Sequence, residues 1–155
     1  MDAKLVNPFI DAFMTVMPQM GFQNITRAKM TVRDKVATSL GVTIIVGFTK
    51  QIRGNVVYNM TEDTAKYIAS TMMMGMPVAE FDTMAQSAIA EMSNMLAANT
   101  ATNLTALDLE VDISTPSVTV GKDTQIKISS GQYLTIEMDL GGHKVDIAIA
   151  VDRDL

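Results

Sequence analysis

Ser87, Glu91 and Asn94 have residue types and spacing that could do chemistry on a bound partner. They are four and three residues apart, in a segment without glycine or proline between Pro77 and Pro116. At about 100° per residue, a helix places these three side chains and Ala98 on one side; we call these four residues the stripe. A carboxylate can pair with a cation, and a neutral amide can orient a water molecule because it donates and accepts hydrogen bonds. An ordinary solvated helix face would show the same spacing, so both interpretations stay open.

The residues between those of the stripe predict a long helix with a buried underside. On the opposite side, the helical projection groups four apolar residues: Ala85, Ile89, Met92 and Leu96. The helix is expected from about Asp82 to about Thr105, and its Asn- and Thr-rich tail, residues 99–103, is expected to fray. Glu91 is the single charged residue from 84 to 107, which is more typical of a docking surface than of a solubilising one.

The elements that must position this helix are predicted from hydrophobic periodicity. Residues 5–20 have apolar side chains at steps of four and predict an amphipathic helix that ends at Pro18 and Gly21. Residues 43–46 and 55–58 predict two strands around a turn at 51–54, and residues 25–32 a further strand. Thr61 is a good N-cap for a second helix, which is expected to stop at residues 75–77.

The remaining residues predict a C-terminal hairpin. Residues 133–140 and 143–151 alternate apolar and polar side chains, and Gly141-Gly142 between them is a two-residue hairpin signal. The order of helix, strands, two helices and strands predicts an α+β fold. We expect one domain over residues 1–155, with two layers: a mostly antiparallel sheet and long helices packed on one face of it.

Composition excludes several classes of function. The chain has no cysteine and one histidine, which excludes thiolate and multi-histidine metal sites within it. A net charge of −5 and 5% aromatic residues without tryptophan argue against nucleic-acid binding. No apolar window long enough for a membrane span and no signal-peptide pattern occur, so we expect a cytoplasmic protein with no membrane contact. The 14 methionines are expected as core filler, with an adaptable binding groove as the alternative.

The segment from Ser87 to Met95, followed by Ser114-Thr-Pro116, resembles the CheC/CheX/FliY family of chemotaxis phosphatases. The family's motif is Asp or Ser, three residues, Glu, two residues, Asn, and a proline further along the chain. Here 21 residues separate Asn94 from Pro116, one fewer than usual, and Ser117 stands where a second proline is common. The opening Met1-Asp-Ala, the Gly54 turn, and residues 61–65 and 72–76 are also similar to the CheX branch. The single Glu-x-x-Asn favours that branch, because CheC-type members often have two.

The resemblance implies a phosphatase that acts on the aspartyl phosphate of a CheY-like receiver domain. Asn94 would align the attacking water and Glu91 would pair with the receiver's lysine, whereas Ser87, Ala98 and Pro116 would contact the partner. No metal or cofactor is expected in this chain, since the receiver supplies Mg²⁺. The carboxylates of Asp108, Glu110 and Asp112 are expected on a solvated strand face instead.

Two further expectations come from the resemblance. The family implies a homodimer. The alternative to an enzyme is a non-catalytic receiver-binding module, or an assembly module like those of flagellar switch proteins, which share the architecture and lack the Glu/Asn pair.

Overall fold

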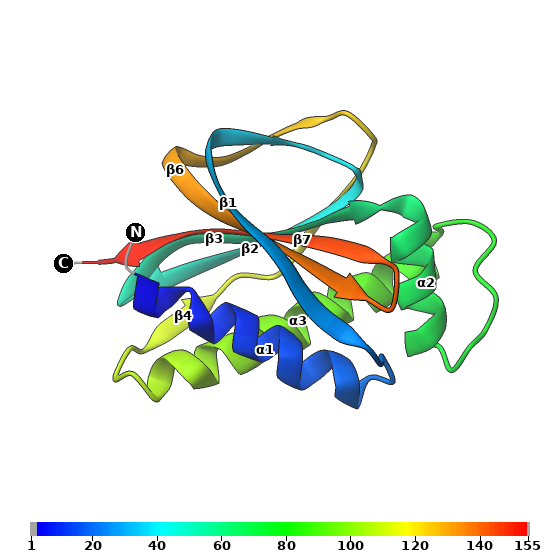
Figure 1. Cartoon of the computed structure of the whole chain (residues 1–155), viewed down its shortest axis with the longest axis horizontal. Helices are drawn as coiled ribbons and strands as arrows, with labels where there is room; N and C mark the ends of the chain where they lie inside the picture. Colours follow the sequence, from blue (N-terminus) through cyan, green and yellow to red (C-terminus); the bar gives the residue numbers. More distant parts are fainter. Residues whose placement is uncertain (1–2, 155) are drawn as a thin grey trace.

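The computed structural model describes residues 3–154 and shows one antiparallel sheet with helices packed against it (Figure 1). Met1 and Asp2 of the opening triplet lie outside the described residues. The elements are, in chain order, a 3-10 turn Ala3–Leu5, α1 Asn7–Gln19, β1 Ile25–Thr38, β2 Gly41–Lys50, β3 Ile52–Thr61, α2 Glu62–Met72, α3 Thr83–Thr105, β4 Val111–Ile113, β5 Ser117–Val120, β6 Gln125–Leu140 and β7 Lys144–Arg153.

The strands form a seven-stranded sheet in the order β1-β6-β7-β3-β2-β4, and β5 also pairs with β2. All of these pairings are antiparallel. The predicted hairpin joins β6 to β7 through Gly141 and Gly142, which have φ of 62° and 102°. The predicted α+β, two-layer architecture is therefore confirmed.

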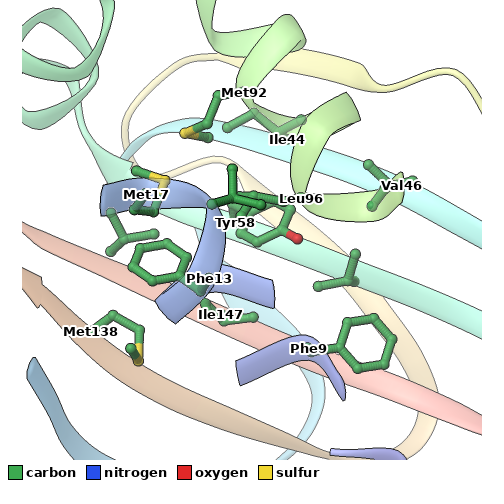
Figure 2. Packing of buried hydrophobic residues seen from close by; sticks show 14 of the residues in the cluster. Phe9, Phe13, Met17, Ile44, Val46, Tyr58, Met92, Leu96, Met138 and Ile147 are labelled. Carbon is green, nitrogen blue, oxygen red and sulfur yellow. The ribbon is translucent and has the colours of Figure 1, made fainter. Parts of the chain in front are cut away.

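The core lies between α1, α3 and one face of the sheet. Because side chains alternate across a strand, every second residue of β2 points to the helices, and Val42, Ile44 and Val46 are fully buried there. Figure 2 shows Phe13 and Met17 of α1 in the same cluster. Burying side chains of this size stabilises the fold by about 1.5–3 kcal/mol each.

The second helix begins at the predicted cap. The Thr61 side chain accepts a hydrogen bond from the Thr64 N–H at 3.2 Å, and Glu62 and Asp63 occupy the first turn. The ring of Tyr67 stacks on His143 of the β6–β7 hairpin, with 3.9 Å between ring centroids. This contact ties α2 to the end of the sheet.

Two expectations about local structure are wrong. The turn expected at 51–54 is shorter, because β3 begins at Ile52 and Gly54 pairs with Phe48 inside the sheet. The tail of α3 does not fray: it is helical to Thr105. Leu104 is fully buried there, and the Asn103 amide donates to the Pro8 carbonyl oxygen at 3.0 Å. Packing against α1 therefore outweighs the weak helix propensity of this tail.

No helix within residues 3–154 is long and apolar enough to cross a membrane.

Candidate functional site

α3 is fixed in place by its N-terminal cap and by the burial of its apolar side. Its N-terminus is capped by Asp82, whose Oδ1 accepts a hydrogen bond from the Ala85 N–H at 2.9 Å. The four apolar residues predicted for the underside are all fully buried: Ala85, Ile89, Met92 and Leu96. Met92 and Leu96 lie among the core side chains in Figure 2. The packed core therefore fixes the orientation of the opposite, outer face of the helix.

The structure places all four residues of the stripe on that outer face. Ser87, Glu91, Asn94 and Ala98 are exposed. Side chains three residues apart on a helix are neighbours, with about 5–6 Å between their Cβ atoms. The Glu91 carboxylate and the Asn94 amide are thus adjacent, and both are open to a partner.

The Glu91 carboxylate is available to pair with a cation of a partner. Within residues 3–154, no lysine, arginine or histidine forms an ion pair with it. The neighbouring stripe residues Ser87, Asn94 and Ala98 carry no charge. A protein partner that brings a cation would meet one unpaired carboxylate beside one amide.

Pro116 lies on a different element from the stripe. It stands between β4 and β5, where the Ser114 N–H donates to the Gly47 carbonyl oxygen at 2.9 Å and Ser114 Oγ accepts from the Gly47 N–H at 2.8 Å. Proline suits this interruption because it has no N–H to donate to a ladder. Both strands contact α3, so the structure brings Pro116 to the sheet edge beside the helix and not onto its outer face.

The residues that the structure describes contain no group of three or more His, Asp or Glu side chains that could hold a metal ion. Of the carboxylates between α3 and β4, Glu110 instead pairs with Lys50 at 2.9 Å. That hydrogen bond lowers the pKa of Glu110, although both side chains are largely exposed.

A cavity of about 260 Å³ lies on the other face of the sheet. Its lining includes Tyr133 and Thr135 of β6 and Asp146 of β7, and the far ends of β1 and β6 arch over that face (Figure 1). Burial raises the pKa of Asp146, with a further contribution from Glu137. Because α3 packs on the opposite face, this cavity is separate from the stripe.

Met84 is a surface residue that was not predicted from the sequence. Met17, Met60, Met92 and Met138 are fully buried as expected of core filler. Five of the described methionines are instead exposed: Met14, Met30, Met74, Met76 and, at 63%, Met84. Met84 lies seven residues before Glu91, which brings it to within about 20° of Glu91 on the helix. An apolar residue on an otherwise polar helical face was the signal that could have identified it.

The sequence profile of a family described as "Chemotaxis phosphatase CheX" matches residues 42–139. The curated CheY-P phosphatase CheX of Thermotoga maritima is 34% identical over 128 residues, which cover 82% of each chain.

Solved structures agree over nearly the whole chain. The CheX chain in the CheX-CheY-BeF3-Mg²⁺ complex from Borrelia burgdorferi is 26% identical, with a TM-score of 0.82 over 97% of this chain and 98% of that one. Chemotaxis protein CheX from Vibrio vulnificus is 23% identical, with a TM-score of 0.85 over 97% of this chain and 100% of that one.

Proposed function

The chain belongs to the CheX family of chemotaxis phosphatases, and we propose that it hydrolyses the aspartyl phosphate of a CheY-like response-regulator receiver. Two relatives support this substrate. One is the curated CheY-P phosphatase of Thermotoga maritima, and the other is the Borrelia burgdorferi CheX in complex with CheY.

The observation on which the proposal rests is the pair formed by Glu91 and Asn94. Both side chains are exposed and adjacent on α3, and Ile89 and Met92 between and beside them are fully buried. Preorganised groups contribute most to phosphoryl transfer by positioning, and a helix anchored along its length supplies such positioning.

We assign Asn94 the alignment of the attacking water. The water oxygen attacks phosphorus, the bond from phosphorus to the aspartyl oxygen breaks, and inorganic phosphate and a free carboxylate result. An amide can both donate to and accept from that water without adding negative charge beside the phosphoryl group. A carboxylate at the same position would be repelled by it.

We assign Glu91 the docking of the helix, by an ion pair with a lysine of the receiver. Ser87, Ala98 and Pro116 would contact the partner around this pair. Mg²⁺ would come with the receiver, and Mg²⁺ is part of the CheX-CheY complex from Borrelia burgdorferi. This division leaves the present chain to supply orientation and the partner to supply most of the charge stabilisation.

The experiment that tests the proposal is the decay of phosphorylated receivers. Receivers from the same genome are phosphorylated with acetyl phosphate in Mg²⁺, and the loss of phosphate is followed with and without this protein. We expect at least one receiver to lose phosphate faster in its presence. Unchanged lifetimes for every receiver, with binding retained, would identify the non-catalytic receiver-binding module instead.

We also propose that the protein is a homodimer. β1 is an outer strand of the described sheet, and its Met30 and Val32 are 44% and 59% exposed. Exposed apolar edge strands are ready to pair with another chain. Light scattering should give twice the 16.8 kDa of one chain; a mass of one chain at micromolar concentration would contradict the dimer. We propose that the protein works in the cytoplasm, together with this receiver partner.

A further inference from the structure

A hollow of about 420 Å³ opens between the end of α2 and the start of α3. Its apolar lining includes Met76 and Met84, which are 58% and 63% exposed. The segment that forms it is fixed at its end by Phe81, which is 8% exposed and belongs to the core. The hollow is thus a formed surface with flexible thioether side chains, which adapt to the shape of a partner.

Two carboxylates complete the lining of the hollow. Glu80 and Asp82 both border it, and neither forms an ion pair within the described residues. One oxygen of Asp82 caps α3, and the carboxylate keeps its negative charge without a cationic partner among the described residues. From Tyr67 to Leu107 the charged residues are Glu80, Asp82 and Glu91, all of them acidic.

The hollow lies near the stripe, at the start of the same helix. Met84 belongs to its lining and lies on the same side of α3 as Glu91, at a distance of roughly 10 Å along the helix axis. A protein interface of ordinary size buries about 800 Å² on each partner, which corresponds to a patch of about 16 Å radius. A partner centred on Glu91 and Asn94 would therefore cover Met84 as well.

We infer that this hollow receives a lysine or arginine side chain of the phosphorylated receiver and so selects among receivers. The inference rests on the proposed function and names a second contact for its substrate. A basic side chain fits both parts of the lining, because its aliphatic stem lies on apolar surface while its charged end reaches a carboxylate. The contact is equally strong in the bound ground state and in the transition state. It therefore affects the affinity for the receiver and the rate of encounter, and it does not change the rate of the hydrolysis step.

The test is a steady-state comparison of kcat and KM for phosphorylated receivers. The double variant E80Q/D82N removes both charges and keeps the cap, since asparagine is as good an N-cap as aspartate. We expect KM to rise about threefold to tenfold, with kcat within about twofold and a weaker dependence of kcat/KM on salt. M84Q should raise KM similarly. M84L should leave KM at the value of the unchanged protein, because leucine keeps the apolar surface.

The matched control is D123N, which removes one exposed carboxylate from the turn between β5 and β6. Asp123 has φ of 66°, a conformation that asparagine also accepts. Its KM should equal that of the unchanged protein. An unchanged KM in E80Q/D82N and in M84Q would overturn the inference and leave the phosphatase intact.

If the protein is not a phosphatase, the inference can still be tested by binding. If the unchanged protein accelerates the decay of no receiver, binding is measured instead with receivers that carry beryllium trifluoride, a stable mimic of the phosphoryl group. Weaker binding by E80Q/D82N and by M84Q would then support the hollow without catalysis. Equal binding by these variants, or no binding by the unchanged protein, would overturn the inference.

Discussion

Replacing Asn94 by alanine should lower kcat for receiver dephosphorylation about 100-fold or more, because the attacking water loses the group that orients it. KM should change little, since Glu91 and the apolar surface around it remain. The fold should be slightly more stable, because the side chain is exposed and alanine is a better helix former than asparagine by a few tenths of a kcal/mol. Phosphate release measured over a range of receiver concentrations checks the kinetics, and urea unfolding checks the stability.

Asn99 provides the matched control for Asn94. It lies on the same helix five residues later, about 140° around the axis, and its Oδ1 accepts from the Asn103 amide at 3.3 Å. Asn99→Ala makes the same chemical change off the stripe and should leave kcat within about twofold. A protein with Asn94→Ala that works at the unchanged rate would refute the assignment of water alignment to this residue.

Glu91→Gln separates docking from water alignment in the same assay. It keeps the size of the side chain and one acceptor oxygen, and it replaces the charged carboxylate with a neutral amide. If Glu91 pairs with a receiver lysine, the variant should raise KM about tenfold, with a smaller effect on kcat. An effect of Glu91→Gln on kcat alone would place Glu91 in the chemistry and contradict its role as an anchor.

The buried and exposed faces of α3 could be predicted from the sequence because they depend on one local period. Ile89 and Leu96 are fully buried and Glu91 and Asn94 are exposed, as a spacing of about 100° per residue requires. The hairpin at Gly141-Gly142 was predictable for the same reason, since two adjacent glycines favour a tight turn whatever surrounds them.

The features that were missed depend on contacts between distant segments. The α3 tail stays helical through the contact between Asn103 and the Pro8 carbonyl, 95 residues apart in the chain. The exposure of Met84 follows from the helical period, but the hollow beside it depends on how α2 and α3 meet, which no local pattern of apolar residues reports. A methionine has the same hydrophobicity in a core and beside a docking surface, so composition could not distinguish the two.

Gly54 is the third such feature, and its replacement by alanine should destabilise the protein by about 3 kcal/mol or more. Its φ is +142°, and a Cβ at this position would lie 1.8 Å from the Ala150 carbonyl oxygen of β7. That oxygen belongs to the backbone of a central strand, paired on its other side with β6, so it cannot move aside cheaply. The midpoint of urea unfolding should fall accordingly.

Alanine substitutions at two other glycines distinguish the cost of the close approach to β7 from the cost of the backbone conformation. Gly142→Ala changes a glycine at φ +102° with open space around it, so it should cost only the strain of about 1–2 kcal/mol. Gly131→Ala also meets open space and has no positive φ, so it should be neutral or stabilise by up to about 1 kcal/mol. If Gly54→Ala costs no more than Gly142→Ala, then β3 and β7 do not approach each other as closely as the structure shows. A cost well above those of Gly142→Ala and Gly131→Ala would establish that β3 can pair with β7 here only if residue 54 is glycine.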